Sequence, residues 1–395
     1  MHSTDILPAV ICLFLALLTI FALSRVLKME TSSADHRFSS IDGLRGFLAF
    51  FVFLHHSCIW YFYLNTGEWT APPSSLYAYF GTGSVLMFFM VTAFLFSSKL
   101  IEGKITGIDW CKLFSSRLLR IVPLYVFVVL LVFIIISCIT HGELNVTPYT
   151  LGMNMLKWLR FWSPGMPPLN GVGESSLIVA AVFWTLPFEW GFYLSLPLLA
   201  ILLNIRPRPA RLYMVLSLLG VHILLKDLHQ LIPFASGIAT AYLYRSPSFR
   251  NFASKKISSL LIISFLALTV LYFPNPRETG SQLLLFCSFA LIACGNNLFG
   301  ILTNNLSKRL GEMSYSVYLL HGMVLFITFN FIIGMSAAKN LTPGQFWLTI
   351  FSISPVLIVL CHSTYRTIEH PFILKTSRLA AWFNSFSKRS INQAQ

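Results

Sequence analysis

Charged residues are scarce in this sequence. Only 11% of its 395 residues are Asp, Glu, Lys or Arg, whereas a soluble globular protein has about 25%. Hydrophobic residues make up 56% of the chain, and they recur in blocks of about 18–25, the length that a helix needs to cross the hydrocarbon core of a bilayer. This composition excludes a soluble globular protein and predicts an all-α, polytopic bundle of transmembrane helices.

Paired cysteines and metal-binding clusters are also missing. The seven cysteines are scattered, mostly inside apolar segments, and no Cys-x-x-Cys or Cys/His cluster with metal-ligand spacing occurs. Scattered cysteines in apolar surroundings behave as small packing residues. The sequence therefore predicts no disulfide framework and no metal.

Eleven apolar segments are interpreted as membrane spans, of which 210–225 and 231–244 are short. Placing the N-terminus outside puts 23 of the 28 lysines and arginines on the cytoplasmic side, together with the C-terminus. Cytoplasmic loops carry such an excess of cations. The net charge of +14 therefore indicates cytoplasmic loops enriched in lysine and arginine, together with an anionic ligand on that side, and not binding to nucleic acid. The predicted spans are 6–25, 45–64, 81–99, 121–140, 177–203, 210–225, 231–244, 257–274, 281–302, 314–335 and 345–363.

The first span differs from a cleaved signal peptide. Such a peptide carries positive charge before its apolar core, but here Asp5 precedes the core, and Arg25 and Lys28 follow it. We expect a retained anchor with a cytoplasmic linker over residues 1–37, a membrane core over 38–375 and a cytoplasmic tail over 376–395.

Ionisable residues inside the spans are the candidates for function, because they are costly in a membrane. In "LRGFLAFFVFLHH", Arg45 begins the second span and His56 lies eleven residues on, about 16 Å deeper and on the same helix face. Taken alone, Arg45 could be an interfacial anchor and His56 a packing residue. Together they predict a cavity lined by one face of this helix, with the side chain of His55 pointing away from it.

Other spans carry matching groups. Glu189 lies near the middle of the fifth span, where it could orient a histidine or bond a tyrosine or tryptophan of its own bundle. His321 follows Tyr315 in "SYSVYLLH" and could be catalytic or structural. Arg117 and Arg120 share a helix face and suit a phosphate, although ordinary cytoplasmic charge bias would also explain them.

The loop over 141–176 is expected to face outside. It combines Trp158 and Trp162 with Pro164, Pro167 and Pro168, which predicts a short interfacial helix followed by a rigid turn. Its aromatic residues could stack on sugar rings or form an interfacial tryptophan belt.

Taken together, these motifs resemble the membrane acyltransferase family 3, whose members O-acetylate surface glycans, lipopolysaccharide and antibiotics. The family hallmark, an arginine and a histidine separated by ten residues, matches Arg45 and His56. The other family blocks follow in order as "RLLR", "WTLPFEWGFYL", "SYSVYLLH" and "IEHPF". One block departs from the pattern, since "FFMVTAFLF" has Thr92 and Ala93 where Ser-Gly is usual. The family core has ten spans, so the first span here is an addition.

The resemblance implies a function and a set of site residues. It implies acetyl-CoA as the cytoplasmic donor and a glycan hydroxyl, lipid-linked or free, as the acceptor, in a bacterial inner membrane. His56 would be the base or an acyl relay, and Glu189 would keep it basic. The expected sets are His56, Arg45 and Glu189 for catalysis; Arg117, Arg120, Arg45, Tyr315 and His321 for the donor; and Trp158, Trp162, Trp184 and Tyr193 for the acceptor.

Two other functions fit the same residues. A proton-coupled transporter or exporter could use His56, Glu189 and His321 as a proton relay, although the inverted repeats of such proteins are not visible in the sequence. A non-catalytic partner in polysaccharide assembly is the second. Donor thioester hydrolysis by the purified protein would separate the acyltransferase from both.

Overall fold

The fold is helical throughout. The computed structural model describes residues 4–28, 38–160, 165–205 and 210–392. Within these ranges there is no β-strand, and the only β-bridge joins Leu169 and Val172. The predicted all-α membrane bundle is confirmed.

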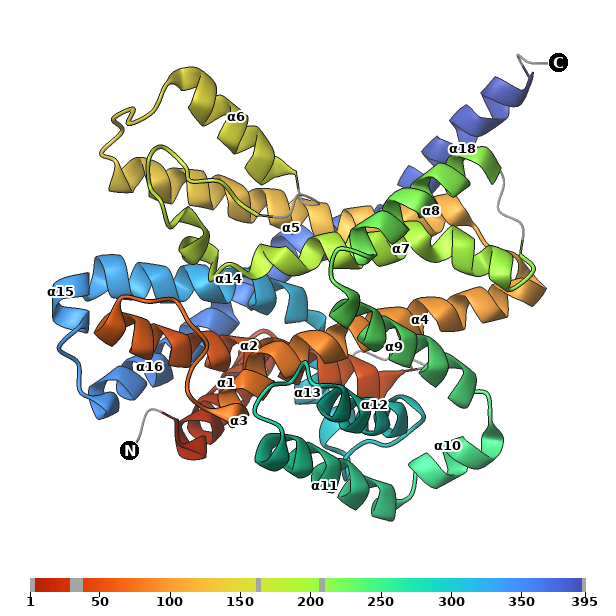
Figure 1. Ribbon diagram of the computed structural model, residues 1–395, viewed down its shortest axis with the longest axis horizontal. Coiled ribbons are helices and arrows are strands. Elements are labelled where there is room, and N and C mark those ends of the chain that lie inside the picture. Colours follow the sequence, from red (N-terminus) through yellow and green to blue (C-terminus); the bar gives the residue numbers. More distant parts are fainter. Residues whose placement is uncertain (1–3, 29–37, 161–164, 206–209, 393–395) are drawn as a thin grey trace. The chain divides into compact units, whose positions relative to one another are not determined.

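The helices follow one another along the chain in the order labelled in Figure 1. They are α1 (Ile6–Val26), α2 (Ser39–Thr66), α3 (Ser75–Ala78), the π-helical turn η1 (Tyr79–Gly83), α4 (Ser84–Thr106), α5 (Trp110–Ile139), α6 (Pro148–Leu159), η2 (Ser175–Val179), η3 (Val182–Trp184), α7 (Thr185–Leu202), α8 (Ala210–Leu224), η4 (Leu228–Gln230), α9 (Leu231–Leu243), α10 (Pro247–Ala253), α11 (Lys256–Tyr272), α12 (Thr279–Ala293), η5 (Ile301–Thr303), α13 (Asn305–Glu312), α14 (Ser314–Ile327), η6 (Thr328–Ile332), α15 (Met335–Ala338), α16 (Pro343–Thr364), η7 (Tyr365–Glu369), α17 (His370–Leu374) and α18 (Thr376–Asn392).

Each predicted span contains helix, but not every one is a full-length span. Among the described residues, seven helices are long and apolar enough to cross a membrane. The ranges 212–243 and 247–272 each pass this test only as a pair of helices joined across a bend, and α12 is a shorter apolar helix. The structure therefore supports a multi-pass protein with seven to nine spans by these criteria, fewer than the eleven counted in the sequence.

The chain divides into two compact units. Unit 1 comprises residues 1–98, 177–182 and 227–361, and unit 2 comprises residues 99–176, 183–226 and 362–395. Each unit is assembled from distant parts of the sequence and has its own buried apolar residues. The predicted boundaries at residues 37 and 375 remain a prediction.

Unit 1 is organised around α2, which packs against α13, α14 and η1 (Figure 1). Glycines on both sides of Arg45 permit this packing. A Cβ atom on Gly46 would lie 2.6 Å from the amide nitrogen of Gly311, and one on Gly43 would lie 2.0 Å from the carbonyl oxygen of Leu302. Small residues allow helix backbones to approach closely in membranes, so the start of α2 is fixed against α13 and η5.

Unit 2 is organised around two helix pairs, α7 with α8 and α5 with α18. Asp109 caps α5 by accepting a hydrogen bond of 2.9 Å from the amide of Lys112, which satisfies one of the free amides at the helix start. Thr147 caps α6 in the same way, with Pro148 in its first turn. The helix predicted in the outer loop is present as α6.

Candidate active site

The helix α2 carries both residues of the Arg45–His56 pair. It runs without interruption from Ser39 to Thr66 and ends at Gly67, which has a positive φ of 77°. Because the eleven-residue spacing equals about three turns, the two side chains leave the same side of the helix. Both are half-buried, whereas Ala49 and Val52, between them on that side, are fully buried.

The imidazole of His56 contacts that of His321 from α14. The Nδ1 atom of His56 lies 3.0 Å from the Nε2 atom of His321, and the ring centroids are 5.0 Å apart. His321 has no exposed surface. Each histidine also places its Nδ1 atom near a carbonyl oxygen one turn back in its own helix, at 3.0 Å from Val52 for His56 and 2.9 Å from Val317 for His321.

These contacts define the protonation of the neutral pair. A carbonyl oxygen can only accept, so both Nδ1 atoms carry the proton. The proton on Nδ1 of His56 is then shared between the Val52 carbonyl and Nε2 of His321, which accepts. The Nε2 atom of His56 therefore keeps its lone pair. With the opposite tautomers, lone pairs would face both carbonyl oxygens. We infer that His56 presents an unprotonated nitrogen on the side away from His321.

Aromatic rings surround this pair. The indole of Trp69 stacks on His56 with ring centroids 6.2 Å apart and an interplanar angle of 15°. His55 turns the other way, and its Nδ1 atom lies 2.7 Å from the carbonyl oxygen of Tyr77. Its ring lies against Gly81 in the π-helical turn η1, where a Cβ atom would approach to 2.4 Å. His55 is therefore held by packing, as its position 100° around the helix predicts.

A short connecting segment covers α14 beside His321. Residues 177–182 belong to unit 1, and the hydroxyl of Tyr318 donates a 3.2 Å hydrogen bond to the carbonyl of Val182. A Cβ atom on Gly322 would lie 2.4 Å from the carbonyl carbon of Val179. In the same segment Ala180 and Ala181 have positive φ angles of 49° and 54°, which cost energy for residues other than glycine.

Unit 2 holds a second cluster, formed by Arg117, Glu189 and Tyr193. The hydroxyl of Tyr193 donates a short hydrogen bond to Oε1 of Glu189, one turn earlier on α7. Arg117, from α5, hydrogen-bonds the same tyrosine and lies 6.0 Å from its ring centroid. The sequence allowed Glu189 either to orient a histidine or to bond a tyrosine or tryptophan of its own bundle. The structure shows a bond to a tyrosine, and the role of Glu189 in orienting His56 remains a prediction.

The remaining predicted residues occupy varied surroundings. Arg120 is half-buried one turn beyond Arg117, and Tyr315 is half-buried at the start of α14. Trp158 is fully buried, with its indole N–H donating 2.8 Å to the carbonyl of Pro167, which favours packing over sugar stacking. Trp184 is 37% exposed. Trp162 lies outside the described residues.

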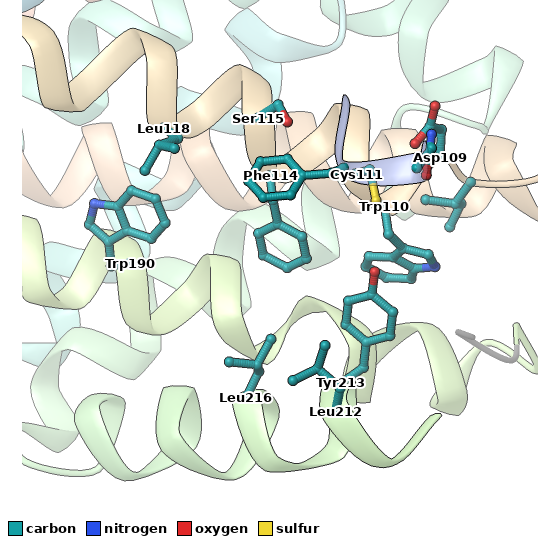
Figure 2. Close-up of a pocket in the computed structure, with 13 residues that line it drawn as sticks. Asp109, Trp110, Cys111, Phe114, Ser115, Leu118, Trp190, Leu212, Tyr213 and Leu216 are labelled. Carbon is teal, nitrogen blue, oxygen red and sulfur yellow. The ribbon is translucent and has the colours of Figure 1, made fainter. Parts of the chain in front are cut away.

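Three further aromatic residues were not singled out from the sequence. Trp69 lies in the loop after α2, where no periodicity marks it. Trp110 and Tyr213 line a cavity in unit 2 (Figure 2), but they belong to helices that are distant in the sequence. In the structure their ring centroids lie 5.4 Å apart, a contact that no sequence spacing predicts.

Metal-binding groups are absent from the described part of the chain. There, no set of three His, Cys, Asp or Glu side chains could hold a metal ion, and none of the seven cysteines forms a disulfide. The groups available for chemistry are thus the two imidazoles of unit 1 and the charged cluster of unit 2.

Comparison with known proteins identifies the family. The family model described as an acyltransferase domain, that of acyltransferase family 3, matches residues 38–366. A comparison with curated proteins found no match, and a comparison with solved structures found none. The matched range covers most of the chain and includes every candidate site residue. The chain therefore belongs to acyltransferase family 3 and is a multi-pass membrane acyltransferase.

Proposed function

We propose that this protein is an O-acetyltransferase that moves an acetyl group from cytoplasmic acetyl-CoA to a sugar hydroxyl of a surface or periplasmic glycan. The observation that carries the proposal is the hydrogen-bonded pair of His56 and His321 within apolar helices. General bases are most often histidines, and this pair leaves one nitrogen of His56 ready to take a proton.

The reaction needs that nitrogen in either of two routes. In direct transfer, Nε2 of His56 takes the proton of the sugar hydroxyl while the hydroxyl oxygen attacks the thioester carbonyl carbon. The carbon–sulfur bond then breaks, and the proton passes to the sulfur of CoA. In the relay, Nε2 itself attacks the carbonyl, the thiolate leaves, and the sugar oxygen then displaces the imidazole while its proton is released. Both routes fail without the lone pair on Nε2.

The donor determines where the cations are needed. The phosphates of CoA cannot enter hydrocarbon without a large desolvation cost, so the nucleotide stays at the membrane surface while the pantetheine arm reaches inward. Arg117, Arg120 and Arg45 are our candidates for holding the phosphates, with Tyr315 and His321 nearer the thioester. Guanidinium groups bind phosphate through paired hydrogen bonds.

The acceptor and the topology follow from charge and family. The excess of cations in alternate loops supports a cytoplasmic C-terminus and an outer N-terminus, in a bacterial inner membrane. The aromatic residues Trp158, Trp162, Trp184 and Tyr193 are the candidates for the glycan side. The buried position of Trp158 makes Trp184 the better of the two described tryptophans.

The test is turnover in proteoliposomes that contain the purified chain, acetyl-CoA and a glycan acceptor. His56→Ala should lower the rate by about 10²–10⁴-fold, with gel filtration showing the same folded species as the wild type. A variant that keeps most of its rate would reject His56 as the base. Transport of the glycan without any acetyl donor would instead support the proton-coupled transporter.

A further inference from the structure

Unit 2 contains a cavity that is lined by none of the predicted site residues. Its volume is about 650 Å³, within the usual range of small-molecule sites. It is lined by the start of α5, by Trp190 of α7, by Tyr213 of α8 and by Phe383 of α18. Figure 2 shows Trp190 and Leu118 at one end and Trp110 and Tyr213 at the other.

The walls of this cavity offer flat aromatic surfaces. The rings of Trp110 and Tyr213 lie with centroids 5.4 Å apart, and Phe114 stacks on Tyr213 at 6.2 Å with an interplanar angle of 12°. Trp110 and Tyr213 are each only 7% exposed, so their orientation is fixed by packing. Such a platform suits a planar aromatic ligand, since base–aromatic stacking tolerates any base.

Polar groups in the cavity argue against a purely apolar occupant. Ser115 lines it and is only 2% exposed, and its hydroxyl has no hydrogen-bond partner. A buried unpaired hydroxyl costs free energy that a ligand with a hydrogen-bonding edge would recover. The carboxylate of Asp109 also lines the cavity and is placed to accept from an amino group. A lipid chain would leave the Ser115 hydroxyl unpaired.

Cations gather beside the same cavity. Lys99 interacts electrostatically with Lys112, with Arg117 and with the carboxylate of Asp109, which lines the cavity. Lys112 and Arg117 lie on α5 and are next in sequence to the lining residues Cys111 and Leu118. Three positive side chains next to an aromatic cavity match a ligand that combines phosphates with a flat base.

We propose that this cavity binds the adenine nucleotide end of the CoA donor, with the base against Trp110 and Tyr213 and the phosphates at Lys99, Lys112 and Arg117. The proposal rests on the proposed function, because the CoA donor is what brings a nucleotide to this chain. It places the donor's recognition elements in unit 2.

The test is equilibrium binding of radiolabelled adenosine 3′,5′-bisphosphate, which carries the nucleotide of CoA without its pantetheine arm, to the purified full-length chain. Tyr213→Ala should weaken binding at least about fivefold, because it removes one stacking surface. Tyr213→Phe keeps the ring and should bind as the wild type does. Tyr149→Ala, which changes a 78% exposed tyrosine on α6, is the matched control outside the cavity.

Cys111 lines the cavity and reports where the nucleotide binds. Adenosine 3′,5′-bisphosphate should slow alkylation of Cys111 in the wild type, and pantetheine should not. Equal binding by wild type and Tyr213→Ala, or no binding at all, would overturn the proposal, as would protection of Cys111 by oleate alone.

These results are separable from those for the reaction. Acetyl transfer without nucleotide binding in this cavity would reject the cavity assignment alone. Nucleotide binding without acetyl transfer to any acceptor would reject the proposed reaction alone.

Discussion

The two units differ in how they hold their polar side chains. In unit 1, His56 and His321 bond to each other and to carbonyls of their own helices, and their neighbours are aromatic or aliphatic. In unit 2, Arg117, Glu189 and Tyr193 form a charged cluster, and Lys99 and Lys112 lie near Arg117. The described pair of unit 1 is joined through imidazole nitrogens, whereas the cluster of unit 2 contains a guanidinium group and a carboxyl group.

This difference suggests a division of labour. Proton transfer benefits from a nitrogen that stays neutral until the reaction, whereas phosphate recognition needs permanent positive charge. Changing His56 or His321 of unit 1 should therefore lower kcat, and changing Arg117 or Arg120 of unit 2 should raise the KM for the donor. Variants that mix the two effects would weaken the comparison.

The largest effect is expected at His321. His321→Leu removes the acceptor that holds His56, so the imidazole can rotate and its tautomer is no longer fixed. A misplacement of this kind can cost about 100-fold in rate, and we expect kcat for acetyl transfer to fall by about that factor. Steady-state kinetics should show a fall in kcat that is larger than any change in the KM for acetyl-CoA, because His321 is also a candidate on the donor side.

The conservative variant separates positioning from packing. His321→Gln offers an amide oxygen that can accept from Nδ1 of His56, so it should recover part of the rate lost in His321→Leu. If both variants were equally slow and equally stable, His321 would not act through this hydrogen bond. If neither were slow, the pair would have no role in turnover.

The sequence singled out both histidines of this pair as candidates, but it did not predict their contact. Arg45 and His56 could be placed on one face because both lie on one continuous helix. His321 lies on another helix, 265 residues away, and no spacing rule relates α2 to α14. Trp69, in a loop, was missed for the same reason. The tautomer of His56 follows only from distances to Val52 and His321, which a sequence does not contain.

The fold was also predictable only in part: the positions of the helices were predicted, but their packing was not. Apolar blocks located the helices, because hydrophobic length is a local property. The count of eleven spans remains a prediction, because the test by length and composition accepts 212–243 and 247–272 only as bent helix pairs. The assembly of each unit from distant segments depends on tertiary packing, such as the contact of Gly46 with Gly311.

A smaller effect, on the donor, is expected in unit 2. Replacing both Arg117 and Arg120 by alanine removes guanidinium groups that would bond the CoA phosphates. Hydrogen bonds to charged groups contribute about 1.5–3 kcal/mol each, so the KM for acetyl-CoA should rise by at least about tenfold with little change in kcat. Arg25→Ala, a cation on α1 in unit 1, is the control. Unchanged donor KM in the double variant would remove the phosphate role.

The smallest effect is expected on stability, at Gly322. An added Cβ atom would lie 2.4 Å from Val179 and 2.5 Å from Ala180, and such overpacking costs about 1–3 kcal/mol. Gly152 on α6 has nothing within 4 Å of its Cβ position, so Gly152→Ala should gain roughly 0.5–1 kcal/mol. Thermal denaturation in detergent should lower Tm for Gly322→Ala and not for Gly152→Ala. Equal Tm values would show that residues 177–182 move to accommodate the added methyl group. A lower kcat for Gly322→Ala, at unchanged donor KM, would indicate that this segment helps to position His321.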